Sequence, residues 1–399
     1  MLNYLIVFIA LVTALILLSK NIRNNQNWKA TVTPLASIIG SGFLVIVPLL
    51  GHSFGSYAPI AITIIILLAY AVGNSIRFNI KFSEALIQKN KIKSIITIDK
   101  VSSIALGTAY IISVAFYLRL LSSFALHGID IENDFYAKII TSLILLTIGL
   151  CGWIKGLDIL EKLEEYSVSI KLAIIAALIF AWGIHDVSES SLNIFTIIVP
   201  KEFDITESFR VLAGALIVVQ GFETSKYLGD NYSVETRIKT MRHAQIIAGI
   251  IYIVFVTLTV PTFPLLGGKI DDTAIIDLSK VVAGILPFML IIAAIMSQFS
   301  AAVADTIGAG GLVAQNSNNK LKSKHGYIVV TIFGVILISF ADIFEIISLA
   351  SRAFAFYYFL QSLISIIAAL KLNKTIKTVL YSFLSILLLA VTIFASPAD

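Results

Sequence analysis

Long apolar runs separated by short polar stretches alternate along nearly the whole chain. A helix that crosses the hydrocarbon core of a bilayer needs about 20 predominantly apolar residues, and most of these runs approach or exceed that length. The pattern predicts an all-α polytopic membrane protein with about twelve transmembrane helices. The runs lie at residues 2–19, 33–51, 57–76, 98–121, 137–154, 166–184, 208–225, 243–265, 281–304, 327–341, 343–370 and 376–396.

Basic residues gather in every second connection between these runs. With the N-terminus outside, the inner connections hold most of the 29 Lys and Arg residues, whereas outer connections carry acids such as Asp130 and Asp134. Cytoplasmic loops of membrane proteins are enriched in Lys and Arg. The charges therefore predict that both termini lie outside a bacterial-type inner (cell) membrane. The loop 77–97 is rich in cations, which indicates attraction to anionic membrane lipids.

The composition narrows the class further. The chain is 58% hydrophobic and 13% charged, whereas soluble domains are about 45–50% apolar and about 25% charged. This excludes a soluble globular protein, a disordered chain and a coiled coil. The net charge of +5 comes from loop clusters, so it does not indicate nucleic-acid binding. Cys151 lies alone inside an apolar run, and the five His residues lack metal-ligand spacing. We therefore expect no metal site, no cofactor and no enzymatic activity.

An internal repeat is visible in the positions of two Gly-Phe pairs. Gly42-Phe43 and Gly221-Phe222 are 179 residues apart, and the same offset carries the runs 98–121 and 166–184 onto apolar runs. Five helices per half is an odd number, so the second half would be inverted. We expect one transmembrane domain over residues 1–399. Its parts are an extra N-terminal helix (1–29), a first repeat (30–185), a second repeat (205–370) and a C-terminal helix (371–399).

Each Gly-Phe pair lies in a run that glycine interrupts. Glycine inside a helix costs about 1 kcal/mol relative to alanine, so Gly40 and Gly42 either allow close helix packing or mark unwound backbone that lines a cavity. Glu223 follows Gly221 and is expected near the middle of the membrane, and an acid at that depth is usually functional. It either pairs with Lys226 on the same helical face or forms a proton or substrate-amine site.

The residues around these breaks resemble the amino acid–polyamine–organocation (APC) superfamily of permeases. The stretch IIGSGFLVIVPLL is similar to their first core helix, and GFETSKYLGDNYSVETRIKTMRHAQII is similar to their sixth. KLAIIAALIFAWG, which begins at Lys171, resembles their fifth core helix, and AAVADTIGAGGLVAQNSNNKLKSKHGY resembles the eighth running into its loop. The usual Asn-Pro pair is absent, with Thr236-Arg237-Ile238 in its place. The resemblance implies a five-plus-five inverted-repeat fold with broken first and sixth core helices.

The resemblance also implies roles for particular residues. Lys171 would replace a bound sodium ion and brace the broken first helix, unless it only extends toward the inner leaflet surface. Ser297 and Ser300 would be sodium ligands or would form interhelical hydrogen bonds. We expect coupling to involve Lys171, Glu223, Ser297 and Ser300. The expected substrate site comprises Ile39, Gly40, Ser41, Gly42, Phe43, Gln220, Gly221, Phe222, Glu223, Tyr110, Ser113 and Tyr117.

Together these features predict a secondary active transporter that moves a small organic solute, an amino acid or amine, by alternating access. We expect a sodium-independent or proton-coupled cycle. A sodium-coupled symporter of the same fold is the alternative within transport. A metal carrier is disfavoured because Ser41 and Phe222 stand where metal-binding side chains would be needed. From another class, a non-transporting sensor or partner subunit could keep the same scaffold. The expected partners are the small-molecule substrate, membrane lipids, and protons or sodium.

Overall fold

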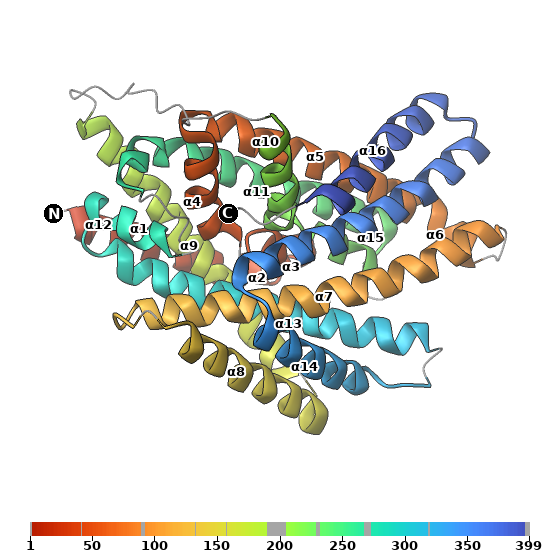
Figure 1. Cartoon of the computed structure of the whole chain (residues 1–399), viewed down its shortest axis with the longest axis horizontal. Coiled ribbons are helices and arrows are strands. Elements are labelled where there is room, and N and C mark those ends of the chain that lie inside the picture. The colour runs from red at the N-terminus through yellow and green to blue at the C-terminus, as the bar shows by residue number, and fades with distance from the viewer. Residues whose placement is uncertain are drawn as a thin grey trace.

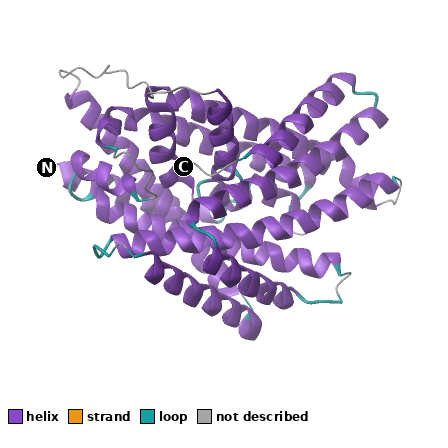
Figure 2. Cartoon of the chain, in the orientation of Figure 1, coloured by secondary structure: helices purple, strands orange, loops and turns teal. Residues whose placement is uncertain are grey.

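The computed structural model describes residues 2–40, 42–88, 92–131, 133–156, 158–189, 205–228, 232–266, 273–317 and 320–395. All regular elements in these residues are helical (Figures 1 and 2). The α-helices are α1 (Leu2–Leu17), α2 (Lys20–Arg23), α3 (Gln26–Ile38), α4 (Gly42–Phe54), α5 (Ala58–Phe78), α6 (Glu84–Gln88), α7 (Lys93–His127), α8 (Asp134–Lys155), α9 (Asp158–Glu189), α10 (Ile205–Gly214), α11 (Val234–Thr259), α12 (Ala274–Val282), α13 (Leu286–Asn316), α14 (Ser323–Phe340), α15 (Ile343–Lys371) and α16 (Thr375–Phe394).

Within the described residues, nine helical stretches are long and apolar enough to cross a membrane. Twelve runs were expected, and the difference has structural causes. Helix α1 has only 16 residues. The run 208–225 is divided between α10 and two short 3₁₀ segments, η3 (Ala215–Val219) and η4 (Phe222–Tyr227). The runs 33–51 and 57–76 contribute to one helical stretch from Gly42 to Ile87. The polytopic all-helical class is confirmed, and the twelve-helix repeat stays a prediction.

Side-chain caps fix where several of these helices begin. The side chain of Asn133 accepts hydrogen bonds from two backbone amides at the start of α8. Asp342 and Glu345 form a reciprocal capping box at the start of α15, which satisfies amides that have no partner inside the helix. Helix α12 was not expected as a separate element, because its 9 residues are too few to span a membrane and only Val281 and Val282 belong to the run 281–304. The offset of 179 residues consequently carries the run 98–121 across the junction of α12 and α13.

The long helices α7, α13 and α15 form the centre of the molecule, and α7 packs against both of the others. About two-thirds of the most apolar window of α7 is buried. Helix α1 packs on α9, and α16 packs on α15. The outer face of α16 exposes Ile376, Phe383 and Ile386, as expected for a helix in contact with lipid.

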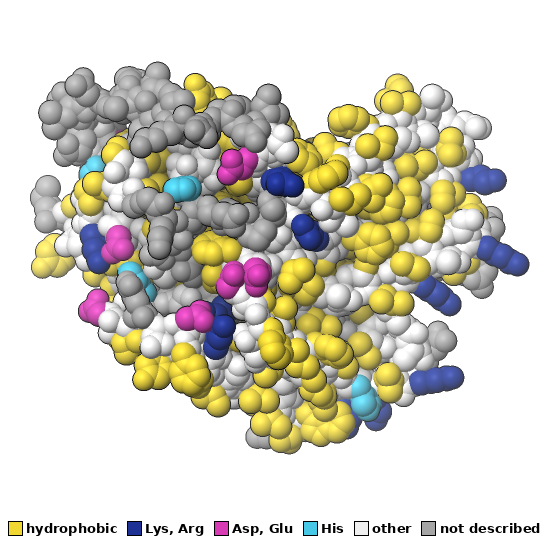
Figure 3. Space-filling model, in the orientation of Figure 1, with side chains coloured by type: hydrophobic (Ala, Val, Ile, Leu, Met, Phe, Trp, Pro, Cys, Tyr) yellow, Lys and Arg dark blue, Asp and Glu magenta, His cyan; other side chains and the backbone are white. Residues whose placement is uncertain are grey.

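Connections that were expected on the same side of the membrane lie at the same end of the molecule. The α15–α16 connection, the end of α13 and the starts of α7 and α14 lie at one end of the molecule, and the end of α7 and the start of α8 lie at the other (Figure 1). On the visible face, several Lys and Arg side chains project from the first end, where no Asp or Glu is visible, and both acidic and basic side chains are visible toward the opposite half (Figure 3). The arrangement agrees with the predicted alternation of loops, while the orientation in the membrane stays a prediction.

Candidate functional site

The first break lies between α3 and α4, where the helical hydrogen bonds stop at Ile39 and Gly40. Ser41, an expected site residue, lies outside the described residues. The ammonium Nζ of Lys171, from α9, donates a 2.7 Å hydrogen bond to the carbonyl oxygen of Ala36. The hydroxyl of Ser297, from α13, lies 2.8 Å from the carbonyl oxygen of Gly40 and 3.2 Å from that of Ile39. The end of a helix leaves carbonyl oxygens without partners inside that helix. Here side chains from α9 and α13 bind such oxygens at the end of α3.

The second break lies between η3 and η4, at Gln220 and Gly221. Gly221 has a φ of 111°, a left-handed conformation that side chains with a Cβ rarely adopt. Its N–H donates to Oε2 of Glu223 at 2.9 Å, and the hydroxyl of Tyr358 donates to the same oxygen at 2.8 Å. Phe222 stacks on the Tyr358 ring with centroids 5.3 Å apart. Glu223 is completely buried.

The two breaks pack directly against each other. A Cβ atom added to Gly42 would lie 2.5 Å from the Cα atom of Val218, and one added to Gly221 would lie 2.2 Å from the hydroxyl of Ser37. Any side chain at either position would therefore separate the two segments. The close-packing and broken-helix explanations of the glycines both apply here, because each glycine stands at an interruption and at a backbone contact.

One hydroxyl connects both breaks. Tyr252, on α11, lies with its oxygen 2.9 Å from the carbonyl oxygen of Ile38 and 2.8 Å from that of Val218. Its ring packs against Phe43, with centroids 5.5 Å apart. The sequence analysis did not identify Tyr252, because a tyrosine inside an apolar run gives no signal that separates it from packing residues.

The three residues expected on the third core helix are all buried in α7. The hydroxyl of Tyr117 accepts a hydrogen bond from Nε2 of Gln220. Ser113 donates to Oδ2 of Asp305 on α13. The ring of Tyr110 faces the ring of Phe354, with centroids 6.0 Å apart. Tyr117 thus joins α7 to the second break, and Ser113 joins α7 to α13.

Asp305 and Tyr358 are further residues that the expected site lacked. Asp305 is buried in the long helix α13, and it could have been found by the same intramembrane-acid argument that selected Glu223. Tyr358 has no comparable signal in the sequence. Among the described residues of the first break, contacts are made by Ser297 and not by Ser300. Ser300 donates to the backbone oxygen of Ser297 in its own helix.

The alternative pairing of Glu223 with Lys226 is not formed. The ammonium of Lys226 instead lies 2.8 Å from Oδ1 of Asp99 and 3.2 Å from Oε1 of Gln361. Glu223 is held by Gly221 and Tyr358, so its carboxylate has no cationic partner among the described residues. Lys226 therefore belongs to a polar cluster on the other side of η4.

A second ion pair continues this cluster. Both terminal nitrogens of Arg237 contact the carboxylate of Glu84, at 2.9 and 2.7 Å, and one of them also donates to the carbonyl oxygen of Lys226. Paired hydrogen bonds of this kind are among the strong ones in proteins. They fix the end of η4 to α6 and α11.

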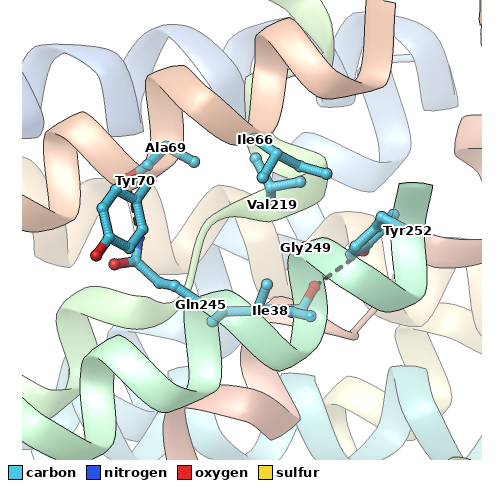
Figure 4. A pocket seen from close by; sticks show the side chains of 9 residues that line it. Ile38, Ile66, Ala69, Tyr70, Val219, Gln245, Gly249 and Tyr252 are labelled. Carbon is cyan, nitrogen blue, oxygen red and sulfur yellow. Dashed lines mark hydrogen bonds between the residues drawn. The ribbon is translucent and has the colours of Figure 1, made fainter. Parts of the chain in front are cut away.

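A cavity lies beside the breaks, between α5 and α11 (Figure 4). It is small, with a volume of about 10 Å³, which is close to the least that one water molecule needs. Ile38 and Val219 bring it to the two breaks, while Gln245 and Tyr70 lie at another part of its wall. No group of three or more His, Cys, Asp or Glu side chains that could hold a metal ion occurs among the described residues.

Comparisons with known proteins agree with the resemblance noted in the sequence. A family model described as an APC superfamily transporter matches residues 20–395. A protein of Aquifex aeolicus (strain VF5), described only as an uncharacterized protein, is 40% identical over 405 aligned positions that cover 100% of this chain and 98% of that protein.

Proposed function

Since the chain belongs to the APC superfamily of transporters, we propose that it is a secondary transporter of a small organic solute, an amino acid or amine, that works by alternating access. The two interruptions support this proposal, because irregular backbone at membrane depth is tolerated where it lines a cavity or is buried in protein. In the proposed layout, residues 30–185 and 205–370 form inverted repeats that rock about the breaks.

The single observation that carries the substrate class is the state of Glu223. Its Oε2 atom accepts two hydrogen bonds, while its buried Oε1 atom has no hydrogen-bond partner in the described part of the chain. A buried, unsatisfied carboxylate oxygen is costly. The ammonium group of a substrate would supply both the missing donor and the missing positive charge. Phe222 and Tyr358 offer aromatic faces beside it.

A substrate carboxylate would be recognised by a different part of the site. Helix α4 begins at Gly42, immediately after the first break, and the N-terminus of a helix presents free amides and a partial positive charge. Since Gly42 lies against Val218 of the second segment, both breaks border the region where the substrate would bind. An amino acid would thus place its two charged groups at the two breaks.

We further propose that the cycle is independent of sodium. The ammonium of Lys171 already contacts the end of the first half-helix, and it supplies there the positive charge that a bound sodium ion would provide. Deprotonation of this amine would remove its charge and loosen the brace, so that a proton gradient could drive the change of state. The sodium-coupled alternative is supported by the hydroxyl of Ser297, which lies near two of the freed carbonyl oxygens.

Flux measurements on the purified chain in proteoliposomes test the proposal. A mixture of labelled amino acids and amines should yield at least one solute that accumulates against its gradient, and Glu223→Gln should lose that accumulation. A solute that binds and stabilises the protein without any flux under proton or sodium gradients would contradict transport and favour the sensor or partner-subunit alternative. The proposed location is a bacterial-type inner membrane, with both termini outside.

A further inference from the structure

The side chain and the backbone of Lys226 connect the end of η4 to three helices. Its ammonium Nζ lies 2.8 Å from Oδ1 of Asp99 on α7 and 3.2 Å from Oε1 of Gln361 on α15. Its carbonyl oxygen accepts a 2.8 Å hydrogen bond from the guanidinium of Arg237 on α11. The side chains of Lys226 and Asp99 are both largely buried. One residue therefore fixes the last turn of η4 to α7, α11 and α15.

A buried polar network adjoins this ion pair. Its centre is Asn79, the first residue of the π-helical segment η2 (Asn79–Ser83) that follows α5. The amide of Asn79 donates to Oε1 and to the backbone oxygen of Gln361, at 3.0 and 2.8 Å, and its Oδ1 atom accepts from Ser365 at 2.8 Å. Gln361 in turn donates to Ser102 on α7. Single π-helical turns are frequent at functional sites. The inner cluster, as we call it, comprises Lys226, Asp99, Gln361, Asn79, Ser102 and Ser365.

The inner cluster separates the second break from the predicted inner side of the membrane. Lys226 follows Glu223 by three residues, which is about 6 Å along a 3₁₀ helix. Asp99 lies six residues, about 9 Å, from the start of α7 at Lys93. That start lies at the end of the molecule from which several basic side chains project (Figures 1 and 3). A solute that leaves the two breaks toward this side therefore has to pass the last turn of η4.

An ion pair in this place suits a reversible contact. The removal of two charges from water costs about as much free energy as their attraction returns, so that buried pairs contribute little net stability. Their best-attested use is to select one arrangement of the chain. If η4 moves away from α7 and water enters, the charges of Lys226 and Asp99 regain their hydration, and the pair separates at a small net cost. A single charge left buried without its partner, in contrast, strongly disfavours the closed arrangement.

We propose that the Lys226–Asp99 ion pair is the inner lock of the transport cycle. While the pair is formed, η4 closes the route from the breaks to the inner side, and Glu223 is completely buried, as in this structure. When Lys226 leaves Asp99 and Gln361, the last turn of η4 moves away from α7 and α15, and water reaches Glu223 from the inner side. Arg237 keeps the moving turn on α11, because it binds the carbonyl oxygen of Lys226 and not its side chain. The lock rests on the proposed alternating access, but it holds for any transported solute.

Access of a buried thiol from the inner side tests the lock. Ser225 lies in η4, is completely buried, and its hydroxyl has no hydrogen-bond partner among the described residues, so Ser225→Cys in a Cys151→Ser background adds a probe with little disturbance. A small charged methanethiosulfonate reagent is applied to inside-out vesicles, whose outer surface is the predicted cytoplasmic face. Asp99→Asn and Lys226→Gln should each raise the labelling rate about tenfold or more, because hydration of the remaining charge favours the open arrangement.

The double variant Asp99→Asn/Lys226→Gln separates the lock from a loss of packing. It has no unpaired charge, so its labelling rate should return toward the wild-type value. Asp277→Asn, in the exposed pair with Lys280, is the matched control and should label as the wild type does. Wild-type rates in both single variants, or an equally raised rate in the double variant, would overturn the proposal. A rise in labelling from the outer side as well would also overturn it, because it would show a generally loosened structure.

Gln361→Met keeps the test decisive if neither single variant folds. It removes the second acceptor of Lys226 and leaves the ion pair, so the labelling rate should rise by a smaller factor, and an unchanged rate would contradict the lock. The labelling requires no solute. Absence of flux in the wild type would therefore reject the proposed transport, whereas unchanged labelling in a protein that shows flux would reject the inner lock alone.

Discussion

The ammonium group of Lys171 lies 2.7 Å from the carbonyl oxygen of Ala36, and this contact fixes α9 to the last turn of α3. Lys171 is only 1% exposed, so its side chain is enclosed by protein. A buried ammonium needs hydrogen-bond acceptors, and the end of α3 supplies one. The contact gives Lys171 a structural reason to influence the first break.

Replacement of Lys171 by alanine should abolish concentrative uptake. The change removes a charged hydrogen bond worth about 1.5–3 kcal/mol, so the occupancy of the braced state should fall at least about tenfold. Wild-type uptake should respond to a pH gradient and not to a sodium gradient, as measured by flux in proteoliposomes. Strict sodium dependence, together with loss of activity in Ser297→Ala, would instead identify a sodium symporter.

Glu223→Gln should weaken solute binding more than Tyr358→Phe does. Glutamine keeps the size of the side chain but removes the negative charge that would bind a substrate ammonium, whereas Tyr358→Phe removes only one donor to Oε2. We expect about a tenfold or greater rise in the dissociation constant for Glu223→Gln, because hydrogen bonds to charged groups are the stronger ones. Calorimetry with the solute found by flux screening measures both values. An unchanged affinity in Glu223→Gln would exclude Glu223 from recognition.

A valine at Gly42 should stop transport, because its Cβ atom would lie 2.5 Å from Val218 and force the two breaks apart. The matched control is Gly107→Val on α7, where an added Cβ atom meets nothing within 4 Å. Both variants should still insert into the membrane, as measured by fluorescence-detected chromatography. Transport at the wild-type rate in Gly42→Val would mean that the contact between the breaks is not required.

Asp99→Asn should loosen η4 from α7. The side chains of Lys226 and Asp99 are only 8% and 18% exposed. The substitution would therefore leave the Lys226 ammonium largely buried without its carboxylate partner, which is costly. Hydrogen exchange of residues 222–228 should rise about tenfold or more relative to the wild type. Asp277→Asn is the control, because the Lys280–Asp277 pair is exposed and pairs of this kind contribute little. Equal exchange in the two variants would contradict a role for the buried pair.

Cysteine labelling tests the orientation. In a Cys151→Ser background, which removes the native exposed thiol, single cysteines at the exposed positions Lys93 and Asp130 should differ in access. A membrane-impermeant maleimide applied to intact cells should label position 130 and not position 93. The reverse labelling would invert the whole predicted topology.

Apolar run length, loop charge and interrupting glycines were enough to predict the membrane class and the location of both interruptions. These signals are local in sequence, as is the acid at Glu223. Residues that come together only through folding were harder to predict from the sequence. Tyr252 and Tyr358 act through contacts with distant carbonyl or carboxylate oxygens, and neither has a local pattern. The sequence does not distinguish Ser297 from Ser300, whereas in the structure the hydroxyl of Ser300 donates to the backbone oxygen of Ser297 in its own helix; the role of both as sodium ligands stays a prediction.

The hydroxyl of Tyr252 has one proton for two carbonyl oxygens, those of Ile38 and Val218. When the two segments separate, only one carbonyl can keep it, and the other loses about 0.5–1.5 kcal/mol of net stabilisation. This loss is comparable with the thermal energy at 25 °C, about 0.6 kcal/mol, so by itself it favours the packed arrangement only weakly. In the proposed alternating-access cycle, Tyr252 would favour one relative position of the half-helices without locking it, and the larger energetic bias would come from the charges at Lys171 and Glu223.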